Sequence, residues 1–566
     1  MSSSPACACC VCPVHGPTGP EAGDPGSGPR WAGPAREQFE QVVAWLDGAE
    51  AMGAGHGELE ARLQVHSREQ YRLLYQGHLD ERARREGRRS GVTGSDGVPR
   101  PRVENGHQRG LTTVFGSVTV TRKAYRPVPG TAADAASPAV SDAPPDPDSD
   151  LVTGGVPATG ATTLPPVSGT PAGNLHPADA VANLPVGRHS AGLSRLAAIE
   201  AARGSFGDAR DAIERATGVG LGKRQVEALA RTAAVDVNQF YAARRPEPCP
   251  EAVLGLQCDG KGIVMRAGSL RPGTAKAATK APATPSARLS PGQKHGRKRM
   301  AEIVAVYDLA PAPRTADDII PAPSTTPARQ PTPPRTPGPV VTGKWLHANV
   351  TDDIPTVIAA MFDEAERRDP DHERTWVALV DGNRQQIDTI GDQATARGVT
   401  VTIVIDFVHV LEYLWKAAWT FFQPGDPDAQ AWVAAHARTV LAGRAVDAAA
   451  TITHQADAGR FRGSERTGAD EAAAYLTRKA PYLDYATALA KGWQIATGII
   501  EGAARFLIKD RMDITGARWT TPGAEAILQL RALIANGDFD EYWTWHQHQE
   551  LRRNHLDRYQ HLDLAA

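Results

Sequence analysis

The sequence predicts a mixed α/β core in the C-terminal half, preceded by a mainly helical region. Short apolar runs with the length of strands begin at residue 253 and recur up to residue 405. Amphipathic helical patterns separate the later runs, and a long helical stretch follows residue 407. Strands that alternate with helices are typical of an α/β layer. Before residue 253 the apolar spacing is mostly helical, which indicates a helical region of its own.

Length and charge limit the class of protein. The chain has 566 residues, which suggests roughly two to four structural units. A formal net charge of -2 gives no overall basic character, so any nucleic-acid contact must come from local patches. Neither a signal peptide nor an uncharged apolar run of about eighteen residues is visible, so we expect a cytoplasmic protein without a membrane segment.

Residues 1–35 are rich in Pro, Gly and Ser, and we expect a disordered tail. The tail carries a cysteine cluster, consisting of Cys7, Cys9, Cys10 and Cys12 with His15 just beyond. The spacing is tighter than the two-residue gap usual in zinc sites, so a reactive tail is favoured and a zinc site is the alternative. A disulfide framework of a secreted domain is not indicated.

Residues 36–127 are predicted to form helices followed by a β-hairpin. Alternating residues on either side of Gly116 predict the hairpin over 112–126. Residues 128–181 are rich in Pro, Ala, Gly and Asp and are predicted to be a disordered linker.

Residues 182–245 have a helix-turn-helix-like pattern. A helix is expected at about 193–203, Ser205 is suited to be the N-cap of the next, and Lys223 and Arg224 open a third with a basic start. Such helices can place a helix end in a DNA groove, although three short helices pack together for structural reasons just as often.

The α/β core is predicted over residues 251–550. Two Pro-rich stretches inside it, 267–293 and 310–338, are expected to be disordered insertions. A helical insertion is expected over about 410–490. The predicted strands are 253–259, 303–307, 340–350, 376–380 and 399–405, and the helices between them are 354–367 and 385–396.

Acidic residues lie at positions where an α/β core could form a metal site. Asp259 and Asp381 each follow an apolar run and precede a glycine, and Glu501 opens a late helix. Carboxylates suit Mg²⁺ or Mn²⁺, and two ions bridged by one carboxylate can activate water or a 3′ hydroxyl. Each acid alone is weak evidence, because Asp-Gly commonly marks a turn. The three together predict a divalent metal site.

The helix that begins near Glu501 has an acidic start and a basic flank. Glu501, Arg505 and Lys509 are spaced i, i+4, i+8 and so share one helical face. The opposite face is apolar and consists of Ile500, Ala504, Leu507 and Ile508. A surface helix with ion pairs is the alternative for this stretch taken by itself.

Four motifs combine these features: QCDGKG at 257–262, LVDGN at 379–383, DFVH at 406–409, and the stretch from Glu501 to Trp519. Together they resemble the bacterial insertion-sequence transposases of the ISKra group, which are related to the mutator-like transposases. The resemblance covers roughly residues 36–126 and 182–550. It implies an RNase H-like core with an Asp-Asp-Glu triad, interrupted by a helical insertion before the Glu.

The resemblance implies that Asp259, Asp381 and Glu501 are the catalytic metal ligands. In the mutator-like pattern an Asp-x-x-His pair follows the middle acid, and Asp406 with His409 fits it as a supporting pair. Asp406 also ends an apolar run, so it competes with Asp381 for the place of the middle ligand.

The implied activity is that of a DNA transposase, a mobile-element enzyme that cleaves and transfers DNA strands with Mg²⁺ or Mn²⁺, two ions in all. Its implied partners are the terminal inverted repeats and target DNA, bound by a homodimer or higher oligomer at the bacterial nucleoid. A silent DNA-binding regulator and a stand-alone metal nuclease are the alternatives. The basic and aromatic residues expected to meet DNA are Arg505, Lys509, Arg511, Arg518, Trp519, Lys223 and Arg224.

Overall fold

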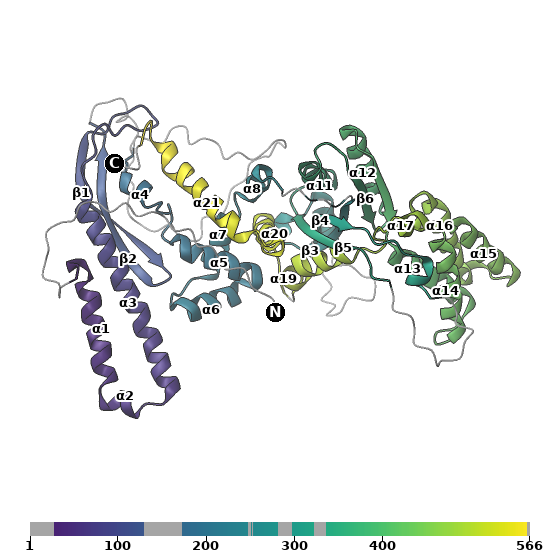
Figure 1. Cartoon of the computed structure of the whole chain (residues 1–566), viewed down its shortest axis with the longest axis horizontal. Coiled ribbons are helices and arrows are strands. Elements are labelled where there is room, and N and C mark those ends of the chain that lie inside the picture. Colours follow the sequence, from purple (N-terminus) through teal and green to yellow (C-terminus); the bar gives the residue numbers. More distant parts are fainter. Residues whose placement is uncertain are drawn as a thin grey trace. The chain divides into compact units, whose positions relative to one another are not determined.

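The computed structural model describes residues 28–128, 173–246, 249, 251, 253–280, 297–321, 336–514 and 516–562. The cysteine cluster, most of the predicted tail and linker, and most of both Pro-rich insertions lie outside these residues. Contacts divide the chain into two compact units, Met1–Ser190 with His555–Ala566, and Ala191–Asn554 (Figure 1). Among the described residues, no helix has the length and apolar character needed to cross a membrane.

The first unit packs a long helix against a two-stranded hairpin. An apolar cluster of Leu79, Leu111, Val118, Val120 and Leu184 joins the helix, the hairpin and a later loop. The elements of this unit are η1 (Arg30–Ala32), α1 (Gly33–Leu46), α2 (Ala49–Gly53), α3 (His56–Arg85), β1 (Arg102–Thr113), β2 (Gly116–Arg126), α4 (Pro177–Val181) and η6 (Leu556–Arg558).

The hairpin lies where it was predicted, but its first strand begins earlier than predicted. Strand β1 begins at Arg102, which pairs with Arg126, and Gly116 starts β2 rather than forming the turn. Residues 102–111 are mostly charged, polar or glycine, so they show little apolar alternation, and the pairing with β2 holds them extended. The predicted linker is also structured at its end, since Leu175 exchanges two backbone hydrogen bonds with Tyr125.

Four helices open the second unit: α5 (Ala191–Arg203), α6 (Phe206–Thr217), α7 (Lys223–Ala233) and α8 (Val237–Ala243). Ser205 is the N-cap of α6, as predicted, and forms a capping box with Asp208. Helices α5 and α7 also pack on α20 (Thr521–Asn536), where Arg531 donates to the carbonyl of Ala202. These helices therefore belong to the same compact unit as the sheet, whereas the sequence predicted them as a separate region. The difference arises because contacts between segments far apart in the chain join them.

A five-stranded mixed sheet forms the centre of this unit and confirms the prediction of an α/β architecture. The strand order is β5-β4-β3-β6-β7, with antiparallel pairing among β5, β4 and β3, and parallel pairing of β3 with β6 and of β6 with β7. The strands are β3 (Val253–Val264), β4 (Lys298–Ala310), β5 (Val340–Asn349), β6 (Thr375–Val380) and β7 (Val401–Ile405).

Two sequence-based boundaries in this region are wrong. Strand β3 does not end at Asp259 but continues to Val264, because β4 pairs with it up to Lys298. The stretches expected to be disordered also contain helices, namely η2 (Ala267–Ser269) and α9 (Pro272–Lys280) in the first and α10 (Ala316–Ile319) in the second. Fold contacts hold them; Arg314, for example, donates to the carbonyl of Trp493 at 2.8 Å.

Helices follow the strands in the expected order. Helix α11 (Ile354–Arg368) packs on β3, β4 and β5, and α12 (Arg384–Arg397) connects β6 to β7. The predicted helical insertion consists of α13 (Phe407–Phe421), α14 (Pro427–Leu441), α15 (Ala445–Ala458), η3 (Gly463–Glu465), α16 (Thr467–Lys479), η4 (Ala480–Tyr482) and α17 (Tyr485–Ala490). The chain then forms α18 (Gly498–Ala503), a π-helical segment (Ala504–Lys509), α19 (Asp510–Met512), α20 and α21 (Phe539–Asn554).

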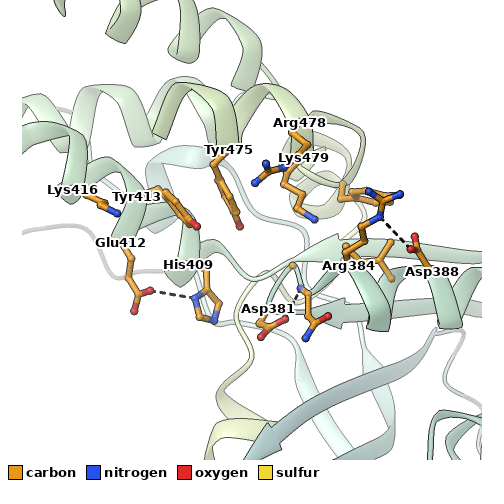
Figure 2. A pocket seen from close by; sticks show the side chains of 14 residues that line it. Asp381, Arg384, Asp388, His409, Glu412, Tyr413, Lys416, Tyr475, Arg478 and Lys479 are labelled. Carbon is orange, nitrogen blue, oxygen red and sulfur yellow. Dashed lines mark hydrogen bonds and ion pairs between the residues drawn. The ribbon is translucent and has the colours of Figure 1, made fainter. Parts of the chain in front are cut away.

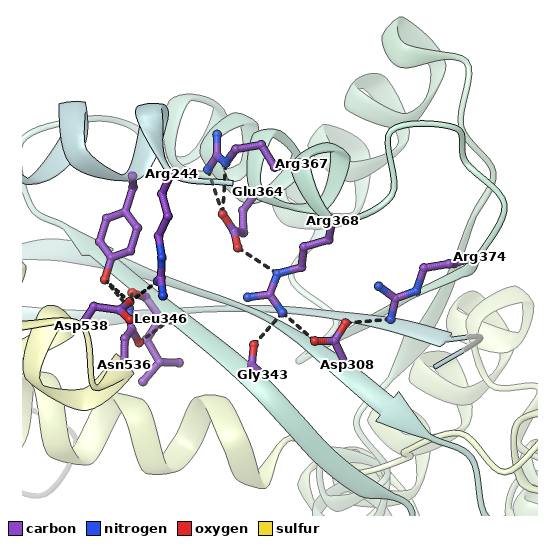
Figure 3. Close-up of polar contacts among 11 residues, drawn as sticks. Arg244, Asp308, Gly343, Leu346, Glu364, Arg367, Arg368, Arg374, Asn536 and Asp538 are labelled. Atoms are coloured by element: carbon purple, nitrogen blue, oxygen red, sulfur yellow. Dashed lines mark hydrogen bonds and ion pairs between the residues drawn. The ribbon is translucent and has the colours of Figure 1, made fainter. Parts of the chain in front are cut away.

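A buried ion-pair network holds the end of the sheet where β3 and β6 begin (Figure 3). The Asp308 carboxylate on β4 accepts hydrogen bonds from Arg368 at 3.1 Å and from Arg374 at 2.8 Å. Arg374 also donates to the carbonyl of Val253 at 3.0 Å. At Gly343, where φ is +55° and β5 bulges, an added Cβ would lie 2.3 Å from the Asp308 carboxylate, so only glycine fits.

Candidate functional site

The structure brings Asp259, Asp381 and Asp406 to one edge of the sheet. Asp381 directly follows β6, and Asp406 directly follows β7. Gln257 pairs with Leu379 across the parallel strands β3 and β6, so Asp259 and Asp381, each two residues further on, reach the same level. The backbone N–H of Asp406 donates to the carbonyl of Val380 at 2.8 Å, which fixes its place beside Asp381.

A tight turn orients the half-buried Asp381. Its Oδ1 accepts a hydrogen bond from the backbone N–H of Asn383 at 2.7 Å. Gly382 has φ +93°, a conformation that L side chains rarely adopt, and a Cβ there would lie 3.3 Å from the hydroxyl of Tyr475. The glycine therefore has a structural role in this Asp-Gly pair.

The acids at this edge influence one another electrostatically. Burial raises the pKa of Asp259, and the charge of Asp381 raises it further. Burial together with the charge of Asp259 raises the pKa of Glu302, a β4 residue that is only 8% exposed, to about 7. Glu302 was not predicted from the sequence, although a carboxylate at the start of the apolar run of β4 was the available indication.

Asp406 is fully buried and both of its carboxylate oxygens are engaged. Oδ1 accepts from the backbone N–H of Val408 at 2.8 Å, which caps α13, and Oδ2 accepts from the hydroxyl of Thr497. The same hydroxyl lies 3.4 Å from Oε1 of Glu501. Asp406 thus connects through Thr497 to the residue predicted to be the last acid.

Glu501 lies in the first turn of α18, as predicted, and its side chain is exposed. The start of this helix is held by Gln257, whose Oε1 accepts from the backbone N–H of Ile500 at 3.0 Å and whose Nε2 donates to the hydroxyl of Tyr307 at 2.9 Å. This role of Gln257 was not predicted from the sequence. A polar residue inside the buried apolar run of β3 was the indication that could have revealed it.

The helix face predicted around Glu501 is partly confirmed. Its apolar residues Ile500, Leu507 and Ile508 are buried, whereas Arg505 and Lys509 are exposed like Glu501. The turn is not a regular α-helix, because Ala504–Lys509 is π-helical. Single π-helical turns within helices are frequent at functional sites.

Two residues predicted to contact DNA lie inside the protein. Arg511 is buried, donates to the carbonyl of Ala201 at 3.0 Å, and lies over the rings of Phe206 and Trp519. Trp519 is also buried and donates its ring N–H to the carbonyl of Met512 at 3.0 Å. Both predictions are wrong for this structure, since the pair joins α6 to the chain after α19. The other predicted contacts are exposed: Arg505, Lys509, Arg518, Lys223 and Arg224.

The predicted acids do not form a closed metal cage. Within the described part of the chain, one group of three possible ligands has its atoms all within 4.8 Å of one another: Asp236, His546 and Glu550. Arg553 already forms ion pairs with both carboxylates of that group, and its charge would oppose a metal cation. We therefore interpret this buried group as a structural network that joins α8 to α21.

A cavity of about 890 Å³ opens beside Asp381 (Figure 2). His409 lines it, with Nδ1 3.2 Å from the Glu412 carboxylate, so this histidine faces the cavity and not the core. One wall comes from the start of α12 and the other from α13 and α16. The polar lining residues are Asp381, Asn383, Arg384, Asp388, His409, Glu412, Tyr413, Lys416, Tyr475, Arg478, Lys479 and Tyr482.

Searches against protein-family models and against curated proteins give no match to this chain. The geometry of the acids and of the cavity therefore carries the functional argument.

Proposed function

We propose that this protein is a DNA transposase that binds the terminal inverted repeats of its insertion sequence and performs metal-dependent strand cleavage and transfer. One observation supports the proposal most: acids from distant parts of the sequence meet at one sheet edge, beside a cavity rich in cations. A mixed sheet followed by a helical block and then by the helix of Glu501 is the arrangement expected for an RNase H-like core of this family.

The donor set at this edge fits a hard divalent cation. Carboxylate oxygens are the ligands that Mg²⁺ and Mn²⁺ prefer, and the repulsion that raises the pKa of Asp259 next to Asp381 would be relieved by positive charge. We assign Asp259, Asp381 and Glu501 as ligands. Asp381 is preferred over Asp406 because hydrogen bonds already occupy both oxygens of Asp406. When bound, two such ions supply activation of the attacking hydroxyl and stabilisation of the leaving oxygen.

In the proposed reaction, water attacks the phosphorus at the end of the element, the bond to the 3′ oxygen breaks, and that oxygen leaves as a hydroxyl. The freed 3′ hydroxyl then attacks a phosphodiester of target DNA and displaces another 3′ oxygen. In this scheme Asp406 and Thr497 position Glu501, and Gln257 positions its helix. His409 supports the site from the cavity side.

Exposed cations would bind the DNA backbone around this edge. Arg505, Lys509 and Arg518 lie near Glu501 in the sequence, and Lys223 and Arg224 open α7. Transposases of this kind act on paired ends, so the proposal includes a homodimer or a higher oligomer on DNA.

The experiment that tests the proposal is Mn²⁺-dependent cleavage of DNA that carries the ends flanking the gene. The variants are Asp259→Asn, Asp381→Asn, Glu501→Gln and Asp406→Asn. Asp388→Asn is a matched control, because Asp388 also lines the cavity but is exposed and paired with Arg384.

We expect cutting at the ends by the wild type and the control, almost none by the variants of the three ligands, and a partial loss for Asp406→Asn. A dead Asp406→Asn with an active Asp381→Asn would reverse the assignment of the middle ligand. Binding of the ends without any cutting would favour the regulator, and cutting without preference for the ends would favour the nuclease.

A further inference from the structure

Two neighbouring cations at the end of α16 line the cavity beside Asp381. Lys479 is only 9% exposed, and burial lowers the pKa of its amine. Arg478 precedes it and is exposed. Among the described residues, neither side chain forms an ion pair or a side-chain hydrogen bond. Figure 2 shows the Lys479 side chain reaching from α16 toward the side of the cavity that holds Asp381 and Arg384.

The other cations of the cavity already have acidic partners. Arg384 lies 3.3 Å from the carboxylate of Asp388, and Lys416 pairs with Glu471. Within the part of the chain that the structure describes, Lys479 and Arg478 are the lining cations without a direct acidic partner, and Asp381 and Asp388 act on Lys479 only from a longer distance. A phosphate entering the cavity would meet these two groups without first breaking an ion pair.

A buried ammonium without a counter-ion is costly, because desolvation disfavours the charged form. A cation in the last turn of a helix does complement the helix dipole. The exposed Arg478 meets that requirement by itself, and the dipole gives no reason to bury a second cation in a cavity. Such burial becomes favourable when a ligand brings negative charge to the site.

We propose that Lys479 and Arg478 bind a backbone phosphate of the DNA strand that is cut at the acidic edge. The inference rests on the proposed function and assigns the helical insertion a direct part in holding the substrate. The cavity is larger than a phosphate requires, and Tyr413 and Tyr475, whose ring centroids lie 3.8 Å apart, also line it. The Tyr475 hydroxyl is buried and has no hydrogen-bond partner among the described residues.

The test measures binding of end DNA in EDTA at several salt concentrations, so that nothing is cut. Lys479→Met is compared with Lys416→Met as a matched control. Lys416 is an exposed lysine that lines the same cavity but already forms an ion pair with Glu471. Loss of one phosphate contact lowers the slope of log K against log salt by about 1, equally for all DNA sequences. We expect this change for Lys479→Met and none for Lys416→Met.

A second measurement separates ligand binding from a structural role. Removing a buried and unpaired charge should raise the Tm of the free protein, so we expect Lys479→Met to be at least as stable as the wild type while it binds DNA more weakly. In cleavage assays its KM should rise more than its kcat falls. Lys479→Arg should restore the salt slope.

An unchanged salt slope for Lys479→Met would overturn the inference, and so would a fall in Tm with unchanged DNA binding. If Lys479→Met does not fold, the exposed Arg478→Gln provides the same comparison. Failure of the proposed function has a different outcome: the wild type never cuts, yet its binding to DNA still depends on Lys479. If Lys479→Met and Arg478→Gln both cut DNA normally with an unaltered KM, the proposed function would stand and the phosphate-binding site would be refuted.

Discussion

Replacing Gln257 by leucine should displace Glu501 without touching any acid. Gln257 is 1% exposed and connects β3 to the start of α18 through the backbone N–H of Ile500. Leucine has a similar size but accepts no hydrogen bond, so that N–H loses its partner inside the protein. An unsatisfied buried donor costs about 1–3 kcal/mol. Tyr307 keeps its other hydrogen bond, to Gln494 at 2.7 Å, so we assign the cost mainly to Ile500.

The effect on cutting follows from geometry. A shift of a reacting group by about 1 Å can cost about 100-fold in rate, and the start of α18 carries Glu501. We therefore expect Gln257→Leu to lower the free energy of unfolding by about 1–3 kcal/mol and kcat by up to about 100-fold. Denaturant unfolding gives the first quantity, and single-turnover cleavage at saturating DNA gives the second.

Gln386→Leu is the matched control for this prediction. Gln386 is also buried, on α12, but its side-chain oxygen has no hydrogen-bond partner among the residues that the structure describes, so leucine should be tolerated there. We expect normal cutting by this variant. A Gln257→Leu protein that unfolds and cuts like the wild type would refute the assigned role of Gln257.

Three further predictions test the surroundings of the site. Asp308→Asn should lower the free energy of unfolding by about 3–5 kcal/mol in denaturant titrations, because Arg374 then has a neutral partner and Arg368 keeps only its ion pair with Glu364; a change below about 1 kcal/mol would contradict this. Gly382→Ala should reduce cutting through strain at φ +93°, whereas Gly391→Ala, in an open position on α12, should cut normally and be about 1 kcal/mol more stable; equal cutting by both would contradict the role of the turn. Because the folded pKa of Glu302, about 7, lies above its ordinary value, the stability measured in EDTA should fall as the pH rises from about 4.5 to about 7 and level off above that. Glu302→Gln should reduce this pH dependence without abolishing it, because burial also raises the pKa of Glu525 to about 7, and an unchanged profile would show that Glu302 does not contribute.

The sequence by itself determined the elements that local patterns encode. The alternation of apolar runs and helical periods predicted the α/β architecture, and Ser205 marked a helix start that the structure confirms. These features depend on neighbours a few residues away, so spacing and capping chemistry are enough to predict them. The order in which Asp259, Asp381 and Glu501 occur along the chain is also visible in the sequence.

Only the tertiary structure decided which side chains are free to act. Arg511 and Trp519 look like DNA contacts in the sequence, but Phe206, more than 300 positions earlier, packs against them and takes them into the interior. Lys479 looks like one more cation at a helix end, yet folding places it in the lining of a cavity, where no described residue forms a direct ion pair with it. Burial and pairing depend on contacts between distant segments, which the local pattern of a single sequence does not specify.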